Sequence, residues 1–584
     1  MLANSQVVNW QLENSPQART LMTTTSLHKP IRTAPSGSAA RPVSGRWILN
    51  LWSDLLLFVA TPLLIVPLVF FLQSPWVGVE AETIGVLVFS FGALGHHFPG
   101  MIRAYGDREL FRRFRARFII APVLLLVVAI PVAQYHLHTL TLVILIWGCW
   151  HGLMQLYGFA RIYDAKVGSI SPVTAYWDWL LCACWFATAQ VFSNDKMADF
   201  LQLWYISGGS LIPPTFVHMF RWVCLAISIA VLIGFLGNHA QQTYRGRMNN
   251  GPVPNSIKLL LLANGIGFWW FAMVYVENAI LGVALFEIFH DVQYLAIVWL
   301  YNCRRVHATP DLGAFMKFMF RRGPGMLSLY VGLVFAYGLY GFAHNRSTHD
   351  DAVQRTLMGL VWASTILHYY YDGFIWKVRE KSTRVGLGLS AGDGPTRAPR
   401  FGGGEWIHLL KCAPLLVVVG WLGFGELSES VFAPQDSEAR ESLLVAQFER
   451  DQNVAEAVPD DLQAQRRAAA SLVKYGWQQE ALDLLESVLQ RHPTFASGRL
   501  LLGDIHLQRK ELDKAAACYE ATCAQSKMKD ERLVASHKLG EIYLQQKQFE
   551  LAKAKFRAAL QEDAGFEPSQ EALRSLDGAV PTAR

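Results

Sequence analysis

Long apolar runs fill the first three quarters of the chain. A helix needs roughly 20 apolar residues to cross the hydrocarbon core of a bilayer, and eleven segments between Trp47 and Phe432 come close to that length. They cover residues 47–72, 83–103, 117–134, 139–160, 173–194, 216–237, 257–277, 280–301, 325–343, 356–376 and 407–430. The pattern predicts an all-α fold in which residues 47–432 form a polytopic transmembrane helical bundle of about 11 spans. The lipid bilayer is therefore the first expected partner.

Lys and Arg gather in short clusters between the apolar runs. Cytoplasmic loops of membrane proteins are enriched in these residues, and here the basic clusters fall in every second connection. The alternation predicts a multi-pass protein of the cytoplasmic (inner) membrane with a cytoplasmic N-terminus, and after eleven spans the C-terminal region lies outside, in the periplasm. The densest cluster, residues 103–117 with six arginines, is also a candidate for binding phosphate or anionic lipid head groups, although a topology signal alone explains it more simply.

The two ends of the chain differ in composition from the apolar region. Residues 1–46 are rich in Ser, Thr, Pro and Arg, which predicts a disordered polar N-terminal tail. After Phe432 the sequence becomes rich in Ala, Glu, Gln and Lys, so a domain boundary falls there. We assign residues 433–465 to a connector, 466–566 to a repeat domain and 567–584 to a C-terminal tail.

Small and large apolar residues recur in the repeat domain with a period of about 34 residues. The last unit contains Leu539, Gly540, Tyr543, Ala552, Phe556 and Ala559. The unit before it contains Leu502, Gly503, His506, Ala515, Tyr519 and Thr522, and a weaker first unit contains Ala468, Ala469, Leu472, Ala481, Leu485 and Val488. These positions resemble those of tetratricopeptide repeats. The resemblance implies a TPR-like α-solenoid that binds a protein partner along its concave groove.

Charge and cysteine content add limits to this picture. The formal net charge is +6, but charged residues make up only 17% of the chain and the mean hydropathy is +0.22. Because the basic residues sit between the expected spans, we expect no nucleic-acid partner. The eight cysteines include no CxxC pair, so they predict neither a disulfide framework nor a thiolate metal site.

Histidines occur inside four of the expected spans, where a polar side chain is costly and marks a candidate functional site. The four spans run in the same direction, and each histidine lies about 10 to 14 residues from the outer end, a layer about 6 Å thick at 1.5 Å per residue. We predict that they converge on one intramembrane metal site. The candidate ligands are His97, His151, His290, His368 and Glu287. His96 is an alternative to His97, because adjacent residues on a helix point about 100° apart.

Polar and aromatic residues surround the candidate ligands. Glu287 and His290 have the i, i+3 spacing that puts both side chains on one face of a helix, as in the Glu-x-x-His pairs of carboxylate-bridged iron bundles. The residues expected to support the ligands are His96, Asp372, Asp291 and Gln155. The residues expected to line a substrate pocket are Trp147, Trp150, Tyr157, Tyr294, Tyr369 and Tyr371.

Imidazole and carboxylate ligands suit iron, zinc or copper. Single histidines on several spans loosely resemble the bacterial β-carotene-cleaving dioxygenases of the Brp/Blh type, polytopic proteins whose iron is held by histidines from different helices. The resemblance implies a non-haem iron oxygenase that acts on a lipophilic small molecule. Two alternatives stay open: a haem-binding electron-transfer protein, and a membrane scaffold or transporter without enzymatic activity in which the histidines hold helices together or relay protons.

Overall fold

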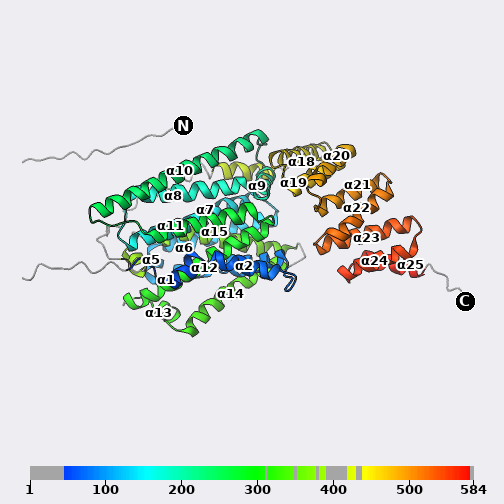
Figure 1. The fold of residues 1–584 in the computed structure, drawn as a ribbon. Helices are drawn as coiled ribbons and strands as arrows, with labels where there is room; N and C mark the ends of the chain where they lie inside the picture. Colours follow the sequence, from blue (N-terminus) through cyan, green and yellow to red (C-terminus); the bar gives the residue numbers. More distant parts are fainter. Residues whose placement is uncertain are drawn as a thin grey trace, which may run out of the picture. The chain divides into compact units, whose positions relative to one another are not determined.

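A computed structural model describes residues 45–309, 312–346, 351–376, 381–387, 389, 413, 417–428 and 437–578. Every regular element in these ranges is helical, which confirms the predicted all-α fold (Figure 1). Nearly all of the predicted N-terminal tail lies outside the described residues.

The apolar region is a series of helices with a few π-helical turns. In chain order its first elements are α1 Leu51–Asp54, η1 Leu55–Val59, α2 Pro62–Gln73, α3 Ala81–Leu87, η2 Val88–Leu94, α4 His97–Gly106, α5 Arg108–Arg113, α6 Arg115–Gln134, α7 Thr139–Lys166 and α8 Pro172–Phe192. The next are α9 Asn194–Ile206, α10 Pro214–Met248, α11 Ser256–Trp270, η3 Phe271–Tyr275, α12 Ala279–Ala308, α13 Ala314–Met319, α14 Pro324–Arg346, α15 Ala352–Ile375 and α16 Lys381–Gly386.

Seven described helices are long and apolar enough to cross a membrane, and a bent pair makes an eighth candidate. The seven are α3 to α4 through η2, α6, α7, α10, α11 with η3, α12, and α14. In the bent pair, α1 with η1 meets α2 at an angle of 55°, across a break at Ala60 and Thr61. The first residue of α2 is Pro62, which cannot donate a helical hydrogen bond back across the break. The expected spans 173–194 and 356–376 are the full-length helices α8 and α15, but their aromatic and polar residues make them less apolar. Of the last expected span, residues 417–428 are described as a short apolar helix.

Helix α12 runs through the core of the bundle. It is buried along most of its length and packs against η1, α2, α3, η2 and η3. Its Phe286 ring lies 4.5 Å from the Trp269 ring of α11, which stacks at 4.6 Å on Phe186 of α8. Aromatic pairs of this kind contribute about 0.5–1.5 kcal/mol beyond the area they bury. The core therefore fixes the position of α12, which carries His290.

A buried ionic cluster joins α7, α8 and α11. The Lys258 ammonium is fully buried and lies 2.7 Å from Asp164 Oδ2 and 3.0 Å from Asp178 Oδ1. Arg161 Nη1 lies 2.9 Å and 2.8 Å from the same two carboxylates. Because each buried charge has an opposite charge in contact, removing one partner leaves an uncompensated charge and is strongly destabilising. The cluster holds the ends of these three helices together.

The repeat domain consists of three helix pairs and a final helix. The pairs are α19 Leu462–Lys474 with α20 Gln478–Arg491, α21 Ala496–Gln508 with α22 Leu512–Gln525, and α23 Lys529–Gln545 with α24 Phe549–Glu562. The predicted small residues allow the close approach: a Cβ atom at Gly503 would lie 2.7 Å from the Tyr519 ring, and one at Gly540 would lie 2.5 Å from the Phe556 ring. The expected C-terminal tail begins with a packed helix, α25 Glu567–Gly578, whose Leu576 is buried against α24.

The connector is mostly helix α18, Ser437–Ala457. Its C-terminal end shares a buried apolar cluster with α9 and the start of α10, to which Leu201 and Val454 belong. Tyr205 of α9 donates a 2.6 Å hydrogen bond to Asn453. The first repeat helix begins at Leu462, four residues before the predicted boundary, and α18 packs along it. The repeat domain is therefore continuous with the connector.

Candidate metal centre

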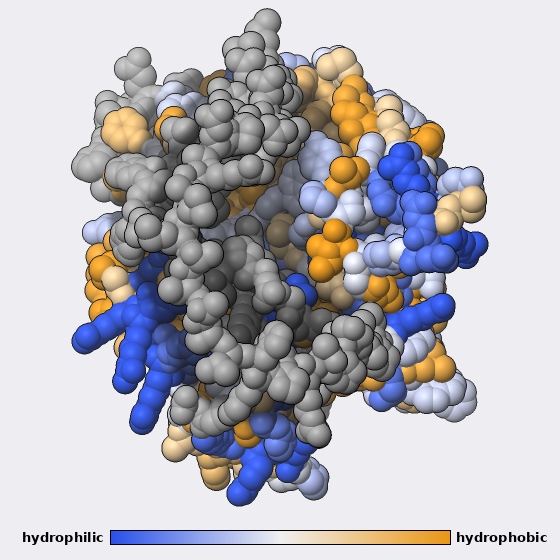
Figure 2. All heavy atoms as spheres, turned by 90° about the vertical axis from the view of Figure 1, so that its left-hand side faces the viewer, coloured by the Kyte–Doolittle hydropathy of each residue, from blue (hydrophilic) through white to orange (hydrophobic). Residues whose placement is uncertain are grey.

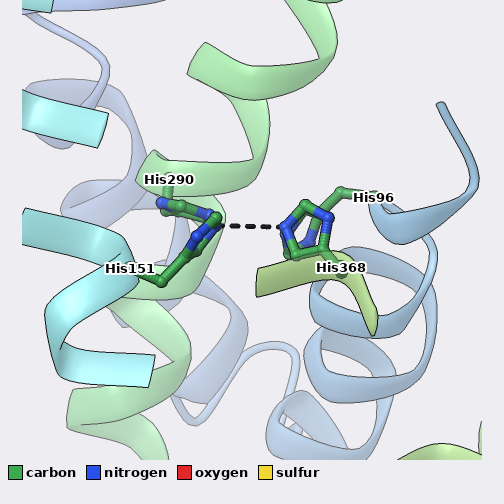
Figure 3. Close-up of side chains that lie close together, drawn as sticks. All are labelled: His96, His151, His290 and His368. Atoms are coloured by element: carbon green, nitrogen blue, oxygen red, sulfur yellow. Dashed lines mark hydrogen bonds between the residues drawn. The ribbon is translucent and has the colours of Figure 1, made fainter. Parts of the chain in front are cut away.

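Four histidines from distant parts of the chain converge inside the bundle. His96 lies in the turn between η2 and α4, while the other three come from the middle of long helices. Each ring offers one nitrogen, and these four nitrogens all lie within 4.8 Å of one another. Figure 3 shows the rings of His151 and His290 on one side and those of His96 and His368 on the other, directed toward each other. The four residues are His96, His151 of α7, His290 of α12 and His368 of α15.

His368 is the link between the rings. Its Nε2 atom lies 3.0 Å from His96 Nε2 and 3.0 Å from His151 Nε2. A nitrogen of a neutral imidazole is either a hydrogen-bond donor or an acceptor. His368 Nε2 therefore cannot form two equally good hydrogen bonds, one to His96 and one to His151. The buried Nε2 atom of His290 has no hydrogen-bond partner among the described residues. The Nε2 atoms of these histidines therefore lie close together without enough N–H groups to hydrogen-bond all of them to one another.

A π-helical turn brings His96 into this group. Residues Val88–Leu94 form η2, and the backbone N–H of His96 bonds to the carbonyl of Gly92 at 2.8 Å. A π turn inserts extra backbone into a helix and rotates every later side chain relative to an ideal helix. The direction in which His96 and His97 point therefore differs from the direction that a regular 3.6-residue period predicts.

His97 is outside the group of four converging nitrogens. Its Nδ1 atom lies 3.0 Å from the Ser364 hydroxyl, which also bonds to the Tyr337 hydroxyl at 2.8 Å. The His97 ring stacks on the His368 ring at 4.6 Å. Of the histidines expected as ligands, the structure thus brings together those of α7, α12 and α15. In place of His97 it adds His96, which sequence analysis named both as a supporting residue and as the alternative to His97.

The Asp291 carboxylate lies in ion-pair contact with His96, whose Nδ1 atom also bonds to the Gly92 carbonyl. Asp291 Oδ1 lies 2.7 Å from His96 Nδ1, and the Gly92 carbonyl lies 3.2 Å from the same nitrogen. Both neighbours are acceptors, so we assign the proton to Nδ1. The Nε2 atom of a neutral His96 then carries a lone pair directed at the other imidazoles. A carboxylate behind a ligating imidazole is the usual support of histidine metal sites.

Asp372 approaches the four converging nitrogens from the side of His368. Its Oδ1 atom accepts hydrogen bonds from the Tyr294 hydroxyl and the Trp376 indole, both at 3.0 Å. Its Oδ2 atom lies 3.8 Å from His368 Nε2, the nitrogen that faces the centre. The Arg103 guanidinium stacks on Trp376 at 4.0 Å and fixes that indole from behind. Asp372 therefore does not orient His368 through its far nitrogen, and its free oxygen faces the centre instead.

The other two polar candidates lie further from the centre. Gln155 donates to the backbone carbonyl of His290 at 2.9 Å and to the Gln293 side chain at 3.2 Å, so it bonds to no imidazole. Glu287 lies on α12 one turn before His290, is partly buried, and has no hydrogen bond or ion pair among the described residues. It is outside the group of four nitrogens.

Two of the expected pocket residues touch the centre. Tyr369 stacks on His151 at 4.8 Å, and Tyr294 lies edge-on to His96 at 5.4 Å and to His368 at 5.2 Å. The remaining four are more distant: Trp147 contacts Tyr369, Trp150 is 45% exposed and faces Trp179, Tyr157 packs against the main core, and Tyr371 bonds to Tyr105. Sequence reasoning missed Ser364, Tyr337, Trp376 and Arg103, whose roles depend on contacts between helices.

A surface groove of about 330 Å³ lies between α2 and α11. Its lining is largely apolar and includes Pro62, Pro67, Asn264 and Phe271. Asn264 donates its side-chain amide to the carbonyl of Val59, in the π turn before the bend. None of the four converging histidines lines the groove, so it is separate from the centre.

The fold and the centre define a class of protein: an all-helical chain that joins an apolar bundle with a buried histidine cluster to a stack of helical repeats. In the repeat domain, residues 479–535 match the family model described as tetratricopeptide repeat. The match covers α20, α21, α22 and the start of α23, and it confirms the repeat assignment there. No curated protein and no solved structure matches the chain. None of these comparisons supports the resemblance of the bundle to the β-carotene-cleaving dioxygenases.

Proposed function

We propose that this chain is an integral membrane metalloprotein in which His96, His151, His290 and His368 bind one metal ion. The observation that carries the proposal is the convergence of four imidazole nitrogens, all within 4.8 Å, from four separate elements. Histidines that only tie helices together need one partner each, and such bonds contribute only about 0.6 kcal/mol on average. Four rings that converge on one another are more than is needed to tie helices together.

The spacing of the nitrogens fits a single ion. A metal bound about 2.1 Å from each nitrogen places neighbouring ligands about 3.0 Å apart at right angles and opposite ligands about 4.2 Å apart. Two nitrogen pairs in the cluster are separated by 3.0 Å. The upper limit of 4.8 Å for the other pairs requires only small ring movements to reach these values. The pair of His96 and Asp291 supports the proposal further, because it presets the tautomer that a ligand needs.

Iron is the metal that we propose, with O₂-dependent oxidation of a lipophilic small molecule as the reaction class. The donors are imidazoles with a carboxylate oxygen of Asp372 beside them, and the described residues contribute no cysteine to the set. Such nitrogen and oxygen donors hold non-haem iron while leaving positions open for O₂. Because the centre lies inside an apolar bundle, a substrate reaches it from the bilayer more readily than from water. Tyr369 and Tyr294 provide apolar ring surface next to the ligands.

The cluster gives less support to the two alternative functions. A bis-histidine haem needs a macrocycle between two opposed imidazoles, whereas here a third and a fourth imidazole occupy the same small space. A proton relay or scaffold does not require four nitrogens at one point. The second candidate function that retains independent support is recruitment of a protein partner by the tetratricopeptide repeats.

We further propose that the bundle lies in the cytoplasmic membrane with the N-terminus inside and the repeat domain outside. The connector contacts α9 and the start of α10, and Glu426 of the last apolar helix accepts hydrogen bonds from the backbone N–H and hydroxyl of Thr139 at the start of α7. The starts of α7 and α10 are the ends opposite to their basic residues Arg161 and Arg245. The basic ends face the cytoplasm by the distribution of charge.

Metal analysis of the purified full-length chain tests the metal proposal. We expect about one iron per chain and an optical spectrum without a haem Soret band. His290→Ala and His368→Ala should each lose the metal, whereas His239→Ala, which changes a histidine of α10 outside the cluster, should retain it. A wild-type protein that binds no transition metal after iron reconstitution would support the scaffold instead. A Soret band that disappears in His368→Ala would support the haem protein.

A further inference from the structure

Two short helices meet at one end of the bundle, and their exposed faces carry a cluster of arginines. A Cβ atom at Gly106, the last residue of α4, would lie 2.8 Å from the Phe315 ring of α13. A Cβ atom at Gly313 would lie 3.6 Å from the Arg108 side chain of α5. Asp107 caps the start of α5 and pairs with Arg305 of α12. The positions of α5 and α13 are therefore fixed against the bundle core.

The inner faces of these helices are apolar and the outer faces are basic. Leu110 of α5 and Met316 of α13 are buried. The exposed charged residues of α5, the first residue of α6, α13 and the turn after α13 are seven basic and one acidic: Arg108, Arg112, Arg113, Arg115, Lys317, Arg321, Arg322 and Glu109. Of these, Arg112, Arg115 and Arg321 have no ion pair or hydrogen bond among the described residues. We call this surface the basic platform.

Exposed aromatic residues accompany the arginines. Phe315 and Phe318 are 50% and 52% exposed on the same short helix that carries Lys317. Figure 2, which views the end of the bundle with α5 and α13, shows hydrophilic side chains projecting beside hydrophobic ones. A helix with cationic and large apolar residues on its exposed side is typical of an element that lies in the membrane interface.

The platform lies where the apolar surface of the bundle begins. Helix α6 starts at Arg115, and Ile119 and Ile120 are already 48% and 62% exposed. Four residues of helix rise only about 6 Å, so the arginines stand at the depth of the lipid head groups if Ile119 faces acyl chains. This position selects a lipid phosphate as the ligand over a phosphate free in solution.

We propose that the basic platform binds the head groups of anionic phospholipids, with Phe315 and Phe318 inserted among the upper parts of the acyl chains. The proposal rests on the membrane location proposed above but is independent of the metal. Basic residues that only set the orientation of the chain in the membrane need no defined lipid partner. The platform, in contrast, should enrich anionic lipid around the protein. Each basic residue at such a surface favours anionic lipid by about 1 kcal/mol.

The test uses full-length protein in nanodiscs of phosphatidylcholine with or without phosphatidylglycerol, followed by mass spectrometry of the lipid that the protein retains in mild detergent. Wild type should retain phosphatidylglycerol preferentially. R112Q/R115Q should lower the preference about 20- to 30-fold, the effect of two charges at about 1 kcal/mol each. R112K/R115K should keep most of it. The matched control is R245Q/R247Q, which removes two exposed cations from the end of α10, on the same expected side, and should change the preference less than twofold.

Three results would overturn the proposal: no enrichment of phosphatidylglycerol by wild type, an equal loss in R245Q/R247Q, or displacement of the lipid by millimolar glycerol phosphate. Helical content and metal content, measured on the same samples, must match wild type in R112Q/R115Q. Protein that enters nanodiscs without lipid preference contradicts only the platform. Protein that never enters them contradicts the membrane location itself.

Discussion

Gly92 leaves the space that the Asp291 carboxylate occupies beside His96. A Cβ atom at Gly92 would collide with Asp291 Oδ2. Glycine is required there by close approach and not by backbone conformation, because Gly92 lies within helical η2. At the scale of single residues, the proposed centre thus depends on a small side chain as much as on the large ones that it brings together.

Gly92→Ala should displace Asp291 from His96 and lower metal affinity about 10- to 100-fold, the usual effect of losing the partner of a ligating imidazole. Helical content should be unchanged. The matched control is Gly158→Ala on α7, where a Cβ atom meets nothing within 4 Å. Competition with a chelator measures both affinities. Equal affinity of the two variants would show that Asp291 does not support the ligand.

The sequence identified the histidines of the centre but could not choose between the two adjacent ones. His151, His290 and His368 stand on long regular helices, so counting residues from the span ends was enough to place them at one depth. His96 follows a π turn. The amino-acid composition of an apolar run does not indicate where the backbone hydrogen bonds change from α-helical to π-helical, so the direction of His96 could not be predicted. Trp376 and Arg103 were missed for a related reason, since their stacking depends on how α4 meets the end of α15.

Among the elements, the apolar pattern located the bundle helices well, because a long apolar run favours a helix, in which the backbone groups are satisfied within the segment itself. The pattern did not reveal bends such as that between η1 and α2. The repeat helices could be read from recurring small residues, since Gly503 and Gly540 each face a large ring. Residues 567–584 have no such recurrence, so packing of α25 on α24 was not predicted.

Helix α18 should be part of the folding unit of the repeat domain. Gln452 of α18 donates to the Ala468 carbonyl of α19 at 3.0 Å, and the Phe448 ring lies 5.0 Å from the rings of Tyr475 and Trp477. A fragment of residues 437–578 should be soluble, monomeric and helical. A fragment that begins at Asp460 should melt at a lower temperature because it exposes this face of α19. Thermal unfolding followed by circular dichroism compares them, and equal melting temperatures would contradict the role of α18.

An ion pair between α23 and α24 should make the fragment sensitive to acid. Arg532 donates to both carboxylate oxygens of Glu562, at 2.7 Å and 2.8 Å, and thereby lowers the pKa of Glu562 from its ordinary value of 4.5. A depressed carboxyl pKa contributes stability that is present above pH 4.5 and is lost as the pH falls below it. Both side chains are about a quarter exposed, so we expect a contribution below about 1 kcal/mol. The free energy of unfolding, measured with urea from pH 6 to 3, should include this loss in wild type. The Arg532→Gln variant should not show it.

For the molecule as a whole, we predict which side of the membrane each end of the bundle faces. Reporter fusions after Lys381 and after Ala433 should give opposite signals, because the last apolar helix lies between them. The fusion after Lys381 should report the cytoplasm and the fusion after Ala433 the periplasm. The same signal from both would mean that the last apolar helix does not cross the membrane.

The metal contents of His96→Ala and His97→Ala, purified in parallel and reconstituted with iron, decide whether the four converging histidines bind a metal. The two residues are adjacent and both are buried, at 2% and 3% exposure, so nonspecific effects of losing a buried imidazole should be similar. Only His96 offers a nitrogen to the group of four. We predict about one iron per chain in wild type and in His97→Ala, and little or none in His96→Ala. Metal retained by His96→Ala, or lost equally from both variants, would contradict the centre described here.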